Sequence, residues 1–188
     1  LKLVTLDNGN PDPQSTFKDE VVEMNYPYNN GSKSIYKSKE RIGSLRFVTP
    51  EIMFVRESNW KSKRSKANLI NLKTYKQYLI YNRTNDEIYD YPGNIQYKTD
   101  LRGNDIPIIV DNSIFFMGEG LTEGGRTPFI DKLNLLTFKK ERIQEFKSDD
   151  YISLIRLMEN DPSSVIIIKE NPETPQNYFI FNMKSKEE

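Results

Sequence analysis

The 188-residue sequence has no cysteine and no histidine, and each absence excludes a class of chemistry. Without cysteine the chain can form no disulfide, no thiolate zinc site and no cysteine nucleophile. Without histidine it has no imidazole to activate a serine, so a Ser-His-Asp site cannot be built from this chain alone. The compartment stays open, because many periplasmic and secreted bacterial proteins also lack cysteine.

An excess of charge of either sign is also missing, since 27 basic residues balance 27 acidic ones. No overall field therefore attracts nucleic acid or an anionic membrane, and any charged partner must be bound by a local cluster. Apolar runs such as "SVIIIK" are far shorter than the ~20 residues that a membrane helix needs. The sequence thus predicts a soluble protein with neither nucleic acid nor a membrane as a partner. It opens with "LKLVTLDNGN", without a methionine or a signal peptide, and we expect it to be a piece of a longer protein.

Aromatic residues are plentiful, with 11 tyrosines and 10 phenylalanines, and this composition favours β-strands. Three short apolar runs resemble one another, and each ends close to a glutamate: 51–58 ("EIMFVRES"), 113–120 ("SIFFMGEG") and 164–171 ("SVIIIKEN"). After each run comes a second strand-like segment, which ends at Asn71, Asn134 or Asn182 before polar turn residues. The repeated unit is therefore a β-hairpin followed by a chain reversal.

Further strand-like segments before and after these hairpins extend them into larger antiparallel sheets. The sequence predicts an all-β fold, a partial β-propeller made of four-stranded antiparallel blades, about two of them whole and two incomplete. Residues 1–188 would form one propeller segment, with outer strands of a preceding blade at 1–27, whole blades at 41–82 and 105–146, and a truncated blade at 151–183. Segment 149–161 also fits a short helix, but its place in the repeat favours a strand.

The segment 118–143 resembles the propeller of the prolyl oligopeptidase family of serine peptidases, and most of all its glutamyl endopeptidase branch. That branch carries a pattern G-x-G-x-(T/S)-x-E-G-x-x-P-F-(L/I)-D followed by a strand and "ERI", and this chain has one extra residue before Pro-Phe. The matching residues are Gly118, Gly120, Thr122, Glu123, Gly124, Pro128, Phe129, Asp131, Glu141, Arg142 and Ile143. Segments 57–72, 86–96 and 3–12 are similar to further motifs of the same branch, so the resemblance covers most of the chain.

This resemblance implies a two-domain peptidase, in which a propeller precedes a C-terminal α/β-hydrolase domain with its serine in a Gly-x-Ser-x-Gly turn. No such turn exists in this chain, so we expect no catalytic residue here. The expected role is non-catalytic: to gate or select peptide substrates for a hydrolase domain absent from this chain. The alternative is a stand-alone propeller scaffold that binds a protein or peptide. An enzyme that uses only Asp, Glu, Tyr or Lys remains a third possibility.

A basic run at 60–66, "WKSKRSK", is the first candidate for binding a charged partner. Arginine offers a planar fork to a carboxylate, and the resemblance to a glutamate-preferring branch implies selection of an acidic side chain. Nucleic acid is a second interpretation, and a solvated hairpin tip is the ordinary one. The predicted substrate-binding residues are Arg56, Lys61, Lys63, Arg64 and Arg126.

Other polar features admit a functional and a structural interpretation. Glu57, Glu119 and Glu170 recur at similar places and could form a ring of carboxylates, or be solvated or bonded to nearby backbone. The turn asparagines are expected to serve the turns, and so are the acidic segments 7–12 and 85–90, which lack calcium-loop spacing. We predict no metal ion and no cofactor. Incomplete blades would expose strand edges, so we expect self-association through them.

Overall fold

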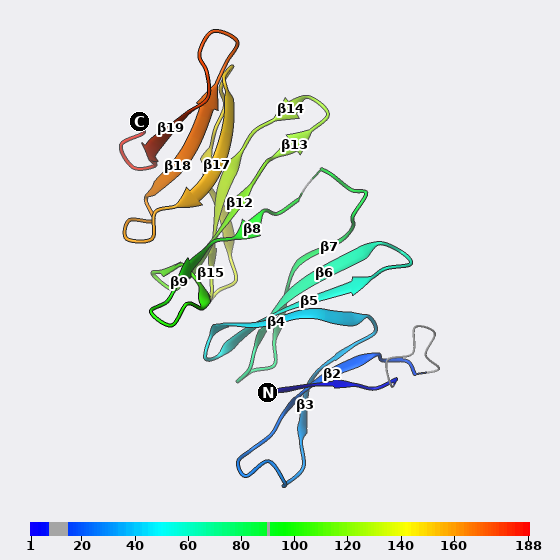
Figure 1. The fold of residues 1–188 in the computed structure, drawn as a ribbon. Helices are drawn as coiled ribbons and strands as arrows, with labels where there is room; N and C mark the ends of the chain where they lie inside the picture. The colour runs from blue at the N-terminus through cyan, green and yellow to red at the C-terminus, as the bar shows by residue number, and fades with distance from the viewer. Residues whose placement is uncertain (8–14, 90) are drawn as a thin grey trace. The chain divides into compact units, whose positions relative to one another are not determined.

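The computed structural model describes residues 1–7, 15–89 and 91–188, and all its regular elements are β-strands (Figure 1). The all-β prediction is confirmed, and the helical interpretation of 149–161 is wrong, because Tyr151–Leu157 forms strand β17. Since the described residues form no helix, they include none that could cross a membrane. Most of the predicted turn at 7–12, and Asp90 of the segment 85–90, lie outside the described residues. The chain divides into two compact units, Leu1–Asp86 and Glu87–Glu188.

The first unit contains two antiparallel sheets whose strands follow one another in chain order (Figure 1). One is made of β1 (Lys2–Thr5), β2 (Asp19–Glu23) and β3 (Lys33–Ser38). The other is made of β4 (Arg41–Thr49), β5 (Ile52–Asn59), β6 (Arg64–Asn71) and β7 (Gln77–Thr84). Strand β3 was not predicted, because it follows a polar loop and has only a short apolar stretch at Ile35 and Tyr36.

The two sheets of the first unit share one hydrophobic core. Val21 from the first sheet and Met53, Val55 and Ile70 from the second are all fully buried in it. Each of these strands alternates core-facing residues with residues that point the other way, as the period of two requires. The sheets are therefore stacked face to face, which is how successive repeats of a repeat protein bury their apolar surface.

The second unit contains a five-stranded sheet, a three-stranded sheet and two small hairpins (Figure 1). The five-stranded sheet has β8 (Asn94–Ile95), β11 (Ile109–Val110), β12 (Ser113–Gly118), β15 (Phe129–Asn134) and β16 (Lys140–Glu145). The three-stranded sheet has β17, β18 (Ser164–Glu170) and β19 (Asn177–Asn182). The small hairpins are β9 (Tyr97–Thr99) with β10 (Asp105–Pro107), and β13 (Leu121–Thr122) with β14 (Gly125–Arg126).

The blade predicted at 105–146 differs from the structure at its start, because the outer strand beside β12 is assembled from two separate pieces. β11 pairs with the start of β12, and β8 pairs with its end. Residues 96–108 connect the two pieces, and the two ends of this connection are joined by a hydrogen bond of 2.9 Å from the Ile108 N–H to the carbonyl of Gln96. The β9–β10 hairpin is thus an insertion within one strand. Fully buried Val165 and Ile167 of the three-stranded sheet pack against the β12 sheet in a second core.

The three turn asparagines make the same contacts, which confirms that they serve turns. In each case the side-chain Oδ1 accepts hydrogen bonds of 2.9 to 3.1 Å from the backbone N–H groups two and three positions later. The residue four positions later donates its N–H to the asparagine carbonyl at 2.8 Å. That residue has a positive φ in all three turns: Tyr75 (58°), Phe138 (55°) and Lys186 (63°). One turn geometry is thus repeated in three sheets, after the second strand of each hairpin that the sequence predicts.

The three glutamates do not share a repeat position, so of the two interpretations given above, the ring of equivalent carboxylates is wrong. The residues that pair with the three turn asparagines are Ile52, Ser113 and Ser164. Glu119 and Glu170 each lie six positions after their reference residue, whereas Glu57 lies five positions after Ile52. Because side chains alternate along a strand, Glu57 faces the opposite way. It is buried and accepts a hydrogen bond from the Tyr36 hydroxyl, and Lys66 Nζ lies 3.5 Å from its carboxylate. Burial and then this hydrogen bond raise the pKa of Tyr36 above its ordinary value.

Candidate functional site

A cationic pocket lies at the tip of the β5–β6 hairpin in the first unit, with a volume of about 480 Å³. The residues that line it come from both strands, from the tip itself and from the chain after β7. They are Arg56, Ser58, Asn59, Trp60, Lys63, Arg64, Ser65 and Asn85. Lys63 at the turn has a positive φ of 54°, so the local backbone reverses there and brings Arg64 back beside the strand that carries Arg56.

The cations of this pocket differ in how far they are already paired. Lys63 Nζ lies 3.3 Å from the carboxylate of Asp86, and Arg64 Nη2 donates to Asn82 Oδ1 at 2.9 Å. Arg56 is exposed on β5 and has no hydrogen bond or ion pair with any residue that the structure describes. Its guanidinium is therefore the group in the pocket with the most unused donors.

The other two predicted site residues lie outside this pocket. Lys61 is exposed at the hairpin tip, with its Nζ 5.8 Å from the centre of a Trp60 ring. Arg126 belongs to the second unit, where it pairs with Glu119, donates to Ser153 Oγ at 3.1 Å and lies 4.4 Å from the centre of the Tyr151 ring. These contacts tie the β13–β14 hairpin to β17, so Arg126 has a structural task in addition to its predicted one.

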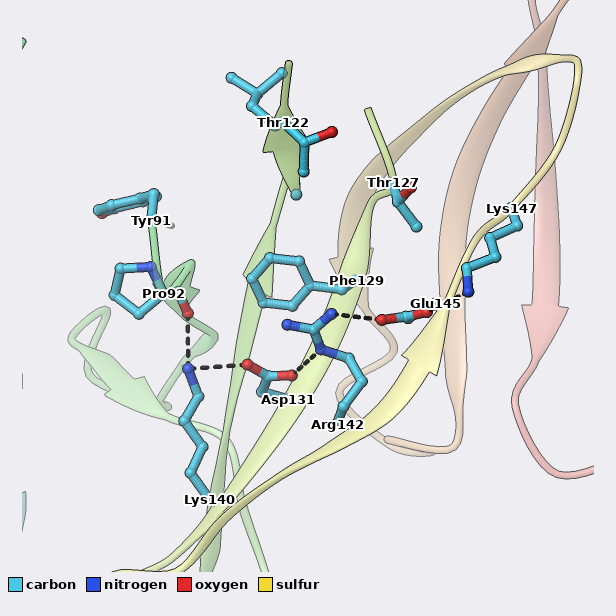
Figure 2. Close-up of a pocket in the computed structure, with 12 residues that line it drawn as sticks. Tyr91, Pro92, Thr122, Thr127, Phe129, Asp131, Lys140, Arg142, Glu145 and Lys147 are labelled. Atoms are coloured by element: carbon cyan, nitrogen blue, oxygen red, sulfur yellow. Dashed lines mark hydrogen bonds and ion pairs between the residues drawn. The ribbon is translucent and has the colours of Figure 1, made fainter. Parts of the chain in front are cut away.

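A second pocket, in the second unit, was not predicted (Figure 2). It has a volume of about 450 Å³, and most of its lining comes from β15, β16 and the base of the β13–β14 hairpin. Its lining residues are Tyr91, Pro92, Gly120, Leu121, Thr122, Thr127, Phe129, Asp131, Lys140, Arg142, Glu145 and Lys147. Eight of these twelve residues lie within the segment 118–143 that carries the family resemblance, and the other four are Tyr91, Pro92, Glu145 and Lys147.

Asp131 is the centre of the charged network in this pocket, as Figure 2 shows. Its carboxylate is buried and lies 2.9 Å from Lys140 Nζ, and it also accepts a hydrogen bond from Arg142 Nε. Arg142 in turn bonds to Glu145 at 2.8 Å and lies 3.8 Å from the centre of the Phe129 ring, where its guanidinium makes a cation–π contact. Since cations and carboxylates are paired within the network, the pocket carries little charge to offer a ligand.

The pKa of Glu145 is held below its ordinary value by Lys147 first and then by Arg142. Among the residues that the structure describes, no group of three or more acidic side chains is arranged to hold a metal ion. The Asp131 network therefore has the features of a structural ion-pair cluster at a pocket wall.

Two glycines of the family pattern are required by the packing of this wall. A Cβ atom at Gly118 would lie closer than 3.0 Å to the Phe129 ring. A Cβ atom at Gly120 would meet the backbone carbonyl of Thr127 closer than 3.0 Å, and Gly120 also has a φ of +58°. The glycines leave room for Phe129, Phe129 supports Arg142, and Arg142 binds Asp131. Residues that are separated along the family pattern, from Gly118 to Arg142, therefore pack against one another as one unit.

Antiparallel sheets that repeat one turn and stack face to face through apolar cores define the chain as a β-propeller segment. Searched against family models, the chain matches none. It is 23% identical over 135 residues to a probable chloroplastic glutamyl endopeptidase of Arabidopsis thaliana, over 68% of this chain and 14% of the relative. It is 24% identical over 164 residues to the probable chloroplastic glutamyl endopeptidase of Oryza sativa subsp. japonica, over 82% of this chain and 18% of the relative.

These matches confirm the resemblance to the glutamyl endopeptidase branch that the motifs indicate. The chain spans less than a fifth of the length of these curated relatives. Among solved structures, it is similar to the β-propeller domain of the Trilobed protease from Pyrococcus furiosus, with a TM-score of 0.40 and 14% identity. That alignment covers 87% of this chain and 45% of the solved one.

Proposed function

We propose that this chain is a non-catalytic propeller segment of a serine peptidase, which gates or selects peptide substrates for a C-terminal α/β-hydrolase domain outside these residues. The observation that carries the proposal is the sequence similarity to two glutamyl endopeptidases over 68% and 82% of the chain. In this proposal residues 1–188 belong to one propeller, with the blade division that the sequence predicts. Hydrolysis would take place on the other domain, since this chain has no histidine and no Gly-x-Ser-x-Gly turn.

The cationic pocket of the first unit supplies the selecting chemistry in this proposal. Arg56 would bind the carboxylate of an acidic substrate residue, because its donors are unused and a guanidinium can hold a carboxylate with two parallel hydrogen bonds. Lys63 and Arg64 add positive charge nearby, and Lys61 extends it along the hairpin tip. Arg126 lies in the second unit and would contact substrate separately from this pocket, by exchanging its bond to Glu119 for one to the substrate.

The exposed Trp60 allows a direct binding experiment, because it is the single tryptophan of the chain and lines the pocket. We expect its fluorescence to change on titration with a glutamate-containing peptide, and to change much less with the same peptide carrying glutamine. Arg56→Ala should weaken binding of the glutamate peptide about tenfold or more, the size typical of a lost hydrogen bond to a charged group.

Arg102→Ala is the matched control, because Arg102 is an exposed arginine in the turn between β9 and β10. It removes one positive charge and should leave peptide affinity unchanged. Equal affinity for the glutamate and glutamine peptides, or an Arg56→Ala variant that binds like the parent chain, would refute selection by this pocket.

A further inference from the structure

The pocket of the second unit that contains Asp131 (the Asp131 pocket) has room for a small ligand. Its volume of about 450 Å³ falls among the roughly 300–1,000 Å³ of typical ligand sites. All of its lining belongs to the second unit, Glu87–Glu188, so the pocket is complete within that unit. Its lining joins charged side chains to apolar ones, and this combination indicates which kind of ligand fits.

Two cations beside Asp131 keep N–H groups that bond to no residue the structure describes. Lys140 Nζ lies 2.9 Å from the Asp131 carboxylate and donates to the Pro92 carbonyl at 3.2 Å, which uses two of its three donors. Arg142 uses Nε for Asp131 and Nη1 for Glu145, and leaves Nη2 unbonded. In Figure 2 this nitrogen lies on the side of the guanidinium turned towards Pro92 and away from Glu145. Because both cations contact one carboxylate, their unused donors lie near each other and can hold a further acceptor.

The charges of the lining favour an acceptor with a single negative charge. Lys140, Arg142 and Lys147 supply three positive charges, and Asp131 and Glu145 supply two negative ones, so one positive charge is in excess. A carboxylate would neutralise it, and its two oxygens can accept a hydrogen bond from each of the two cations. Bound across them from Asp131, it would complete an alternation of opposite charges.

The apolar part of the lining comes from Tyr91, Pro92 and Leu121. Figure 2 shows Tyr91 and Pro92 on the side of Asp131 where Lys140 binds. The Tyr91 hydroxyl donates to Asn94 Oδ1 at 2.7 Å, which orients the ring. Leu121, on the β13–β14 hairpin, is 38% exposed and still has apolar surface to bury. A ligand that carries an apolar group next to its charge would therefore remove this surface from water.

We propose that the Asp131 pocket binds a carboxylate attached to an apolar residue, the chemistry of a peptide C-terminus or of a small apolar carboxylic acid. Lys140 Nζ and Arg142 Nη2 hold the carboxylate, and the apolar group packs on Tyr91, Pro92 and Leu121. The site is separate from the cationic pocket of the first unit. The proposal does not depend on the peptidase function proposed above.

Nuclear magnetic resonance titration of the isotopically labelled 188-residue chain with N-acetylphenylalanine tests this proposal. We expect the backbone amide signals of Leu121, Thr127 and Arg142 to shift, with a dissociation constant of about 1 mM or lower. The matching amide, which has no negative charge, should bind at least about tenfold more weakly, and so should acetate, which has no apolar group. The indole signal of Trp60, the single tryptophan, reports separately on the pocket of the first unit.

Two substitutions separate the charged and apolar parts of the site. Arg142→Gln should weaken binding of the acid about tenfold and leave binding of the amide unchanged. Leu121→Ser should weaken binding of both probes at least about threefold, because it removes apolar contact alone. Lys139→Gln is the control, since Lys139 is exposed just before β16, does not line this pocket, and loses one positive charge without an expected effect on affinity. Circular dichroism shows whether each variant is folded, and Leu121→Ser decides if Arg142→Gln is not.

Equal affinity for the acid and the amide would overturn the proposal. So would shifts confined to Trp60 and its neighbours, which would place the acid in the first-unit pocket, or a folded Leu121→Ser variant that binds both probes like the parent chain. A five-residue peptide that ends in phenylalanine identifies the source of the carboxylate. Binding at least as tight as that of N-acetylphenylalanine supports a peptide C-terminus, and much weaker binding supports a free small acid in the same site.

Discussion

Replacing Gly120 by alanine is expected to lower the free energy of unfolding of the second unit by about 3–5 kcal/mol. Two costs add at this position. The φ of +58° lies in the left-handed region that side chains rarely adopt, and the new Cβ atom would collide with the rigid backbone carbonyl of Thr127. The collision cannot be relieved by a rotamer change, so the strand that carries Phe129 must shift. Urea unfolding followed by circular dichroism measures the loss.

Gly124→Ala is the matched control for this prediction. Gly124 lies in the same β13–β14 hairpin, and a Cβ atom there would meet only the side-chain oxygen of Thr122, at 3.8 Å. We expect this variant to stay within about 0.5 kcal/mol of the parent chain, as surface substitutions usually do. If Gly120→Ala is as stable as Gly124→Ala, the packing unit described for this pocket wall is wrong.

Asp131→Ala is expected to cause the second-largest loss, about 2–4 kcal/mol of unfolding free energy. The substitution removes the buried carboxylate that both Lys140 and Arg142 contact, and leaves two cations close together without it. Lys140 and Arg142 are 25% and 41% exposed, so water takes over part of the lost interaction and keeps the effect below that of a fully buried pair. The same unfolding measurement applies.

The control for Asp131 is an exposed ion pair from the other unit. Asp86 pairs with Lys63, and the two side chains are 71% and 61% exposed, so Asp86→Ala should not change stability measurably. Similar stabilities for Asp131→Ala and Asp86→Ala would contradict the central role given to the buried carboxylate.

Hairpins and turns could be predicted from the sequence because their signals are local. The strands β5 and β6 and the turn at Asn71 follow from alternation and from the preference of asparagine for turns. Strand β3 could not be predicted, since it is held by pairing with β2 across a polar loop. The divided outer strand beside β12 was missed for the same reason, because only pairing across the inserted β9–β10 hairpin joins its two pieces.

The candidate site could be predicted where its residues share one hairpin. Arg56, Lys63 and Arg64 gather in one pocket because β5 and β6 are adjacent in sequence and in space. The Asp131 pocket was missed because it depends on the register of β15 with β16, which places Arg142 opposite Asp131, and on the approach of Pro92 from a distant part of the chain. The family pattern already contained Phe129, Asp131 and Arg142, but without the sheet register it could not show that they touch.

The central claim is that these residues serve a hydrolase domain located elsewhere, and the nucleotide sequence of the whole reading frame tests it most directly. We predict that codons downstream of Glu188 encode a Gly-x-Ser-x-Gly turn, then an aspartate and later a histidine, in the order of an α/β-hydrolase triad. A reading frame that stops without such a domain, or continues only with further propeller repeats, would contradict the claim and favour a stand-alone binding scaffold.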